Sequence, residues 1–350
     1  MTERPLSTRQ LNRALLARQL LLERSSSPLT DALEQVAGLQ AQYAPSPYVG
    51  LWSRLRDFHR DQLTTALERR QAVQATLLRV TIHVVSAADY PLLTEAVRGA
   101  RLEWWARAAQ PQLEGADVRA AAALVRRRLA DGPARQAELV KLLTDRGFPR
   151  AVWIGVGLLV DMVRVPPSGT WERRRADLYG LASDWLGPWQ VDEADALEHL
   201  VRRYLAGFGP ASLGDLGSWA GMPLTRLRPA LERVGTRRFR DERGGELFDL
   251  PGAPLPDPET PAPARFLSTW DANLLVHARR TQLLPERHRP RIFSTRTPHS
   301  FPTFLVDGAV AGTWRHQQGR VELEPFEPLP RATRRQLEDE AERLALFHQG

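Results

Sequence analysis

Two glutamines separated by one residue, Gln40 and Gln42, are the side chains of this sequence best suited to position a small polar molecule. Each carboxamide carries one acceptor oxygen and two N–H donors, so a pair of them can hold and orient a water molecule. Neither amide titrates near neutral pH, so neither can remove a proton as a general base. A site of this kind therefore suits only a reaction whose leaving group is already activated.

The backbone conformation decides whether the two amides can act together. In a regular helix, residues i and i+2 point well apart, whereas in an extended chain they lie on the same side. We expect a helix around Leu33 to run into Gln40–Pro47 and to stop at the two prolines of that segment. At such a break both amides could converge on one water. Residue types alone also allow a simpler interpretation, in which the glutamines cap or solvate a helix end.

The composition excludes several other kinds of site. The sequence contains no cysteine, which removes disulfides, thiolate zinc sites and iron–sulfur clusters. The eight histidines are scattered without a His-x-x-x-His pair, and His83 is interpreted as structural. Lys141 is the only lysine, and no glycine-rich phosphate-binding loop precedes it. We therefore expect neither a metal ion nor an organic cofactor, and lysine Schiff-base chemistry has a single candidate.

The charge balance favours a polyanionic partner. The 350 residues include 48 basic and 41 acidic side chains, a formal net charge of +7. Nearly all the cations are arginines; a high-GC gene would also produce this, but arginine offers bidentate contacts to phosphate and guanine. No apolar stretch is long enough to span a membrane, and Met1–Gln10 lack the apolar core of a signal peptide. We expect a cytoplasmic monomer that does not bind membranes.

An order of helices followed by short strands occurs three times along the chain, in residues 1–112, 113–189 and 190–252. Helices followed by one or two strands are typical of a winged helix. A Gly-Pro-Ala triplet at 132–134 and again at 209–211 supports the repeat. The expected strand pairs, or wings, lie at Val73–Val85, at Met162–Val165 with Trp171–Tyr179, and at Arg237–Arg240 with Glu246–Leu250.

The last part of the chain differs in composition and in its predicted secondary structure. Six prolines in Pro251–Pro263 mark a connection, and short β-rich runs follow it, with Asp307-Gly308 as a strong hairpin turn and Thr333–Phe347 as a final helix. The expected strands are Arg265–Trp270, Thr303–Val306, Val310–Trp314 and Val321–Phe326. The expected fold class is thus mainly α with α+β: three tandem winged-helix units plus a small C-terminal β-rich domain within residues 253–350.

The glutamine pair belongs to a longer motif, Gly38–Tyr48, which continues into Gly50-Leu-Trp-Ser-Arg54. Further distinctive strings lie at Trp270–His277, Pro302–Gly308 and Ala311–Trp314. These motifs resemble the AlkZ/YcaQ-type winged-helix DNA glycosylases, and the resemblance covers essentially the whole chain. The first motif is the more specific because it combines the glutamine pair, a Pro-Ser-Pro break and Gly-Leu-Trp-Ser-Arg.

The resemblance implies tandem winged helices that form a concave DNA-binding surface and a catalytic Gln-x-Gln or Gln-x-Asp element. Gln40 and Gln42 match the Gln-x-Gln form, found in the branch that unhooks crosslinks left by an alkylating natural product and protects the producing actinomycete. The implied enzyme is a monofunctional, nucleoid-associated glycosylase that hydrolyses the N-glycosidic bond of N7-alkylated, cationic purines in double-stranded DNA. A cationic base departs without acid catalysis, which suits two uncharged amides.

Arginine clusters are the expected contacts to DNA phosphates. Those on the presumed wings and in the turn-rich segment after Pro285 are favoured, although each also fits a solvated surface. The candidates are Arg54, Arg173, Arg174, Arg175, Arg237, Arg238, Arg240, Arg287, Arg289, Arg291 and Arg296.

A function from another class remains open on the sequence alone: a winged-helix transcriptional regulator, or a non-catalytic DNA-binding protein. Regulators usually carry one such unit per chain and read palindromic sites as dimers. Three units on one chain, without an evident dimerisation helix, argue against a regulator.

Overall fold

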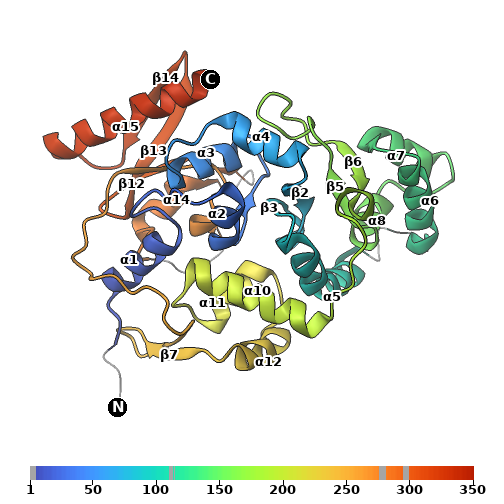
Figure 1. Ribbon diagram of the computed structural model, residues 1–350, viewed down its shortest axis with the longest axis horizontal. Helices are drawn as coiled ribbons and strands as arrows, with labels where there is room; N and C mark the ends of the chain where they lie inside the picture. Colours follow the sequence, from blue (N-terminus) through green and yellow to red (C-terminus); the bar gives the residue numbers. More distant parts are fainter. Residues whose placement is uncertain (1–4, 110–112, 114, 276–280, 295–298) are drawn as a thin grey trace.

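The computed structural model describes residues 5–109, 113, 115–275, 281–294 and 299–350. Helices make up most of its regular structure, and its strands form small antiparallel sheets, so the expected fold class is confirmed. Figure 1 shows the first unit at the centre, the second at the right, the third below and the C-terminal sheet at the upper left. None of the described helices is both long and apolar enough to cross a membrane.

The first unit carries the glutamine pair. Its elements are α1 (Thr8–Arg18), α2 (Leu29–Gln35), β1 (Leu39–Gln40), α3 (Ser46–Arg54), α4 (Arg60–Glu68), β2 (Ala72–Thr76) and β3 (Ile82–Ser86). The strand pair expected at Val73–Val85 is therefore confirmed. The helix expected to run into Gln40–Pro47 is wrong: α2 ends at Gln35, and the prolines begin α3 because proline in a first helical turn sacrifices no hydrogen bond.

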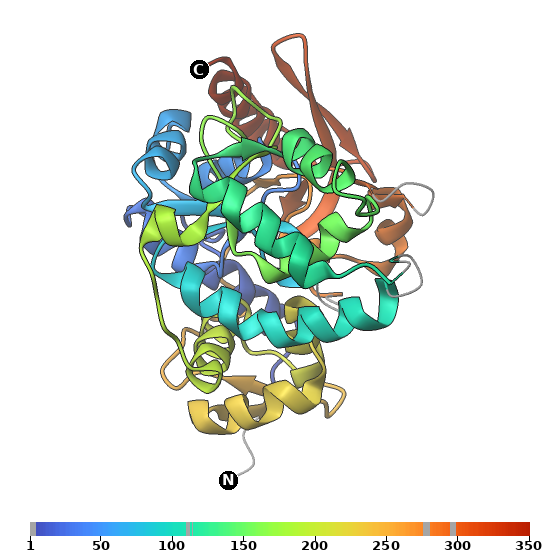
Figure 2. The same ribbon diagram turned by 90° about the vertical axis from the view of Figure 1, so that its right-hand side faces the viewer.

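A long helix, α5 (Asp89–Ala109), follows β3 and was not expected from the sequence. It packs against the helices of the second and third units, as Figure 2 shows. The second unit comprises α6 (Val118–Ala130), β4 (Ala134–Arg135), α7 (Gln136–Thr144), α8 (Val152–Leu159), β5 (Met162–Arg164), β6 (Leu178–Leu181) and α9 (Ala182–Leu186). Its second wing strand therefore begins later than expected, and Trp171–Ala176 belong to the wing loop.

The third unit matches its expected order closely. It consists of α10 (Glu193–Phe208), α11 (Leu213–Ala220), α12 (Leu224–Val234), β7 (Arg237–Arg240) and β8 (Glu246–Asp249). Local signals explain its boundaries: Asp192 caps α10, Ser212 and Asp215 form a capping box on α11, and Gly221 ends α11 in the left-handed conformation.

The first two units share one sheet. Among the described strands its order is β1-β3-β2-β5-β6-β4, and the join is the antiparallel pairing of β2 with β5 through Gln74–Arg164 and Ala75–Val163. One hydrophobic core then joins all three units, with Val73 and Val163 from this sheet, Val97 from α5 and Leu200 from α10. The second unit also has a hydrophobic core of its own between α6, α7 and α8, with Val125, Leu139 and Val156 at its centre.

The C-terminal segment forms a sheet of order β14-β13-β12-β9 covered by a helix. The strands are β9 (Arg265–Leu267), β12 (Thr303–Val306), β13 (Ala309–Gln317) and β14 (Arg320–Pro325), and the helix is α15 (Arg331–Gln349). Asp307 and Gly308 connect β12 to β13 with positive φ angles, as expected for this turn.

Buried ion pairs tie distant segments to the first unit. Arg18 on α1 donates to both carboxylate oxygens of Asp249 at the end of β8, at 2.5 and 2.8 Å, and both side chains are buried. Arg54 at the end of α3 pairs with buried Asp271 at 3.0 Å. Because a lone buried charge is strongly unfavourable, each pair fixes the position of the segment that supplies its partner.

We predict that Arg18→Met lowers the free energy of unfolding by about 3–5 kcal/mol, because it leaves Asp249 buried without its counter-charge. The double variant Arg18→Met/Asp249→Leu should recover most of that loss, since no charge remains to be desolvated. Urea unfolding of wild type and both variants measures this. Equal losses in the single and double variants would contradict it.

Candidate active site

Gln40 ends a short strand at the outer edge of the shared sheet, and Gln42 lies in the bend two residues later. Gln40 is the last residue of β1 and pairs with His83 on β3, which places both side chains on the same face of the sheet. The backbone remains extended for one more residue, because the Ala41 amide donates to the Ile82 carbonyl at 2.7 Å. The extended backbone therefore belongs to an edge strand and not to a helix end, and Gln42 follows it at a bend.

Each amide is oriented by one hydrogen bond to its carbonyl oxygen. The Oε1 atom of buried Gln40 accepts from Nη2 of Arg79 at 3.0 Å. The Oε1 atom of exposed Gln42 accepts from the backbone N–H of Ile82 at 3.0 Å. These donors fix which end of each amide is oxygen, and each amide keeps a second lone pair and its N–H donors for another molecule.

Arg79 is held in a conformation that costs energy. It lies in the turn between β2 and β3 with φ 52° and ψ 25°, the left-handed region that a residue with a Cβ rarely adopts. Its Nη1 donates to the carbonyl of Trp219 at the end of α11. Arg79 also packs closely against Gly221, where a Cβ atom would lie only 2.9 Å from Cγ of Arg79. Burial lowers the pKa of Arg79 to about 10, so its guanidinium remains charged at neutral pH. The third unit therefore holds the side chain that orients Gln40.

His83, opposite Gln40, is buried and neutral. Burial is the main cause that lowers its pKa to about 3, and the charges of Arg79 and Arg101 act in the same direction. Its Nδ1 lies 3.0 Å from the Thr81 carbonyl, so a neutral ring donates there and leaves Nε2 as an acceptor. Gln40, Gln42, Arg79 and His83 thus form a site without a carboxylate.

A groove lies beside the segment that follows Gln42. Its volume is about 870 Å³, within the range of roughly 300–1,000 Å³ typical of pockets for organic ligands. Three parts of the chain line it: the turn after the glutamines, the wing loop of the second unit, and the C-terminal sheet with the end of α15. Aromatic rings from all three parts face it, namely those of Tyr43, Trp171, Trp270, Phe301, Trp314 and His348.

The wing loop of the second unit brings three expected DNA-contact arginines close to the glutamines. Arg173, Arg174 and Arg175 are all exposed there. Nη1 of Arg174 donates to the hydroxyl of Tyr43, the residue after Gln42, at 3.0 Å. This contact places a cationic wing beside the candidate site.

The expectation that Arg54 contacts DNA is wrong in this structure. Its side chain is buried, pairs with Asp271 and also donates to the Gly50 carbonyl at 2.9 Å. Burial of α3 over its whole length explains this, because the helix lies between the first unit and the C-terminal sheet. A guanidinium enclosed in this way cannot reach a phosphate.

The remaining candidate arginines lie elsewhere on the molecule. Arg237, Arg238 and Arg240 are exposed on β7, which Figure 1 shows at the lower edge near the N-terminal segment. Arg287, Arg289 and Arg291 are exposed on short helical turns, where Arg287 pairs with Glu327 and Arg291 lies over the Phe326 ring. Arg296 and His277 lie outside the described residues. The structure therefore brings only the Arg173–Arg175 group, among the described candidates, into contact with the segment after the glutamines.

Two parts of the candidate site were missed from the sequence. Arg79 lies in a run, Leu77–Thr81, that contains no Gly, Pro, Asn or Asp to indicate a turn. Its conformation depends on contact with α11, which no local signal reveals. The groove is formed by residues more than 200 positions apart in the sequence. The only local signal for it is Pro45 and Pro47, which mark the start of α3 beside one of its walls.

The fold and the charged wing place the chain among winged-helix proteins that act on DNA. A comparison with protein families matches residues 33–347 to the family "DNA glycosylase AlkZ-like". The chain belongs to this family, and it is a DNA glycosylase with a role in DNA repair. The prediction of an enzyme is thereby confirmed over that of a regulator.

Among solved structures, the chain is similar to the DNA glycosylase AlkZ of Streptomyces sahachiroi. The TM-score is 0.82 at 19% sequence identity, and the match covers 100% of this chain and 98% of that one. A comparison with curated proteins gives no match. Within the described residues, no group of three or more His, Asp or Glu side chains is arranged to hold a metal ion.

We predict that acid destabilises the protein partly through His83. The unfolded histidine titrates near its usual pKa of about 6.5, whereas in the folded state it stays neutral down to about pH 3. The unfolded state therefore binds more protons between these values, and stability falls as pH is lowered through them. Between pH 7 and pH 5, wild type should lose about 2 kcal/mol more than His83→Gln.

Urea unfolding at both pH values measures this difference. Val85→Ala, on the same strand, is the matched control, because it removes packing without removing a titratable group. It should lower the stability equally at pH 7 and pH 5. A wild-type and a His83→Gln protein with the same pH dependence would contradict the prediction.

Proposed function

We propose that Gln40 and Gln42 catalyse the hydrolysis of the N-glycosidic bond of N7-alkylated purines in double-stranded DNA. The main support is the segment at the sheet edge in which both amides are oriented by separate donors, Arg79 and the Ile82 amide. Bulky adducts, including interstrand crosslinks from an alkylating natural product, belong to the proposed substrate class.

In the proposed reaction, the bond between C1′ and N9 breaks, and its electron pair neutralises the cationic base. A water held by the amides adds to C1′ through its oxygen, and its proton leaves to solvent. The amides position the water and do not take its proton, because a carboxamide is not a base at neutral pH. The intermediate needs no covalent attachment to the protein, so the enzyme is monofunctional in this proposal.

The groove beside Tyr43 supports bulky substrates. With a volume of about 870 Å³ it exceeds what an alkyl group requires. Its aromatic walls offer stacking surfaces for a planar adduct or base. An adduct that remains tied to the opposite strand could extend along such an open groove while its sugar lies against the glutamines.

The exposed arginines are the proposed contacts to the DNA backbone. Arg173, Arg174 and Arg175 come first because the Arg174–Tyr43 contact places them beside the glutamines. Those on β7 and near α14 (Arg289–Ile292) would bind phosphates further along the duplex. Such contacts carry little sequence information, which suits an enzyme that recognises damage.

We predict that Gln40→Ala and Gln42→Ala each lower the single-turnover rate of N7-methylguanine release by about 100-fold, the typical cost of losing one preorganised polar group. Gln71→Ala, at an exposed glutamine directly before β2 in the same unit, is the matched control and should keep the wild-type rate. Base release from methylated duplex DNA measures the rates.

A uracil-containing duplex should release no base above the spontaneous rate, because a neutral base is a poor leaving group. Thermal unfolding and DNA affinity of each variant separate a defect in chemistry from a defect in folding or binding. Wild-type rates in folded Gln40→Ala and Gln42→Ala proteins would remove the glutamines from the mechanism while leaving the family assignment intact.

We predict that replacing Arg173, Arg174 and Arg175 together by alanine weakens DNA binding and flattens its salt dependence. The slope of log Kobs against log[salt] should fall by about one for each phosphate that the variant no longer neutralises. The matched control replaces the same three residues by lysine, which keeps the charges and should keep most of the slope. Titrations of a labelled duplex at several salt concentrations measure both. An unchanged slope in the alanine variant would place the DNA elsewhere.

A further inference from the structure

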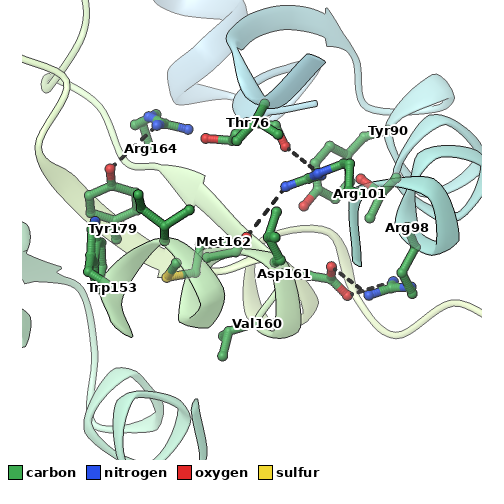
Figure 3. Close-up of a pocket in the computed structure, with 15 residues that line it drawn as sticks. Thr76, Tyr90, Arg98, Arg101, Trp153, Val160, Asp161, Met162, Arg164 and Tyr179 are labelled. Atoms are coloured by element: carbon green, nitrogen blue, oxygen red, sulfur yellow. Dashed lines mark hydrogen bonds and ion pairs between the residues drawn. The ribbon is translucent and has the colours of Figure 1, made fainter. Parts of the chain in front are cut away.

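A second cavity, separate from the groove, lies where α5 meets the wing strands of the second unit (Figure 3). Its volume is about 170 Å³, well above the roughly 10–15 Å³ of such space that one water requires. Figure 3 shows Arg98 and Arg101 reaching in from α5, with Arg164 and Tyr179 from β5 and β6 on the opposite side. The proposed reaction uses none of these residues.

The charges around this cavity are not balanced. Nη1 and Nη2 of Arg98 each donate to a carboxylate oxygen of Asp161, at 3.2 and 3.1 Å, and its Nε donates to Glu95 at 2.9 Å. Both nearby carboxylates are thus engaged by one guanidinium. Among the described residues, Arg101 and Arg164 form no ion pair.

Arg101 and Arg164 also retain unused donors. Both side chains are more than nine-tenths buried, at 9% and 6% exposed. Arg101 donates to the backbone carbonyls of Thr76 at 3.1 Å and Gly157 at 3.5 Å, and its Nε reaches no acceptor in the described chain. Arg164 makes one long hydrogen bond, 3.4 Å to the Tyr179 hydroxyl, while its Nε and Nη1 reach no acceptor among the described residues.

Both guanidiniums are cationic at neutral pH. Burial lowers the pKa of Arg101 to about 10, and it also lowers the pKa of Arg164. A buried cation without a counter-charge is costly, and water alone compensates it poorly. Planar N–H donors of this kind match the oxygens of phosphate, which arginine binds in bidentate fashion.

We propose that this cavity binds a single oxyanion of the phosphate class, held between Arg101 and Arg164. The unused N–H donors of Arg101 and Arg164 favour a tetrahedral oxyanion over chloride, because several oxygens can accept from them, and the size of the cavity accommodates one such group. The phosphate can come from solution or, as a singly charged diester, from a DNA strand. The proposal does not depend on the roles of Gln40 and Gln42.

Thermal unfolding in Tris buffer at constant ionic strength tests this site, with sodium phosphate replacing sodium chloride. Wild type should show a saturable rise in Tm of about 2–4 °C. Arg164→Gln and Arg101→Gln should lose that rise, and Arg164→Gln should be at least as stable as wild type in chloride, because it removes an unpaired buried charge. Arg119→Gln, an exposed arginine on α6, is the matched control and should keep the full rise.

A Tm that rises equally and without saturation in wild type and Arg164→Gln would overturn the proposal. If the variants fail to fold, calorimetric titration of wild type with phosphate decides, and the absence of saturable binding overturns it. The affinity for duplex DNA, measured with and without phosphate at fixed ionic strength, then identifies the source of the bound phosphate. Competition in wild type but not in Arg164→Gln indicates a DNA phosphate, and an unchanged DNA affinity indicates a free anion.

Discussion

The antiparallel pairing of β1 with β3 is the constraint on which the candidate site depends. It places Gln40 opposite His83 and lets the Ala41 amide reach the Ile82 carbonyl, so both glutamines are held at the sheet edge beside β3. A shift of one residue would turn Gln40 to the other face, since side chains alternate along a strand. The same register brings Gln40 to Arg79 in the β2–β3 turn, and the contact of Arg79 with Trp219 carries the constraint into the third unit.

Packing between the units limits what each winged helix can do. In an isolated winged helix, the recognition helix is free to enter a DNA groove. Here α3 is buried against the C-terminal sheet, and Arg226 on α12 is held by Glu103 and Glu193. The wing loop of the second unit, with Arg173–Arg175, stays exposed beside the candidate site. Both α3 and Arg226 are thus engaged within the protein.

Much of the fold could be predicted from the sequence, because capping residues, turns and periodic apolar patterns act locally. The third unit and the Asp307-Gly308 hairpin are examples. The roles of the arginines, in contrast, could not be predicted from local sequence signals. Arg18 and Arg54 carry the same charge as the exposed arginines, but long-range partners, Asp249 and Asp271, bury them. A count of charges cannot separate these roles, because burial is decided by contacts between residues hundreds of positions apart.

The glutamine motif could likewise be found, but its setting could not, since an edge strand of two residues depends on β3 for its conformation. The charges of the residues around the glutamines matter for the proposed bond cleavage. When an N7-alkylated purine leaves, the positive charge moves from the base to the sugar, so the total charge in the site stays the same during bond cleavage. A neutral base would instead separate into an anion and a cation, which requires an acid or a carboxylate. Gln40, Gln42 and neutral His83 provide neither. The absence of an acid or carboxylate among these residues therefore accords with the proposed cationic substrates.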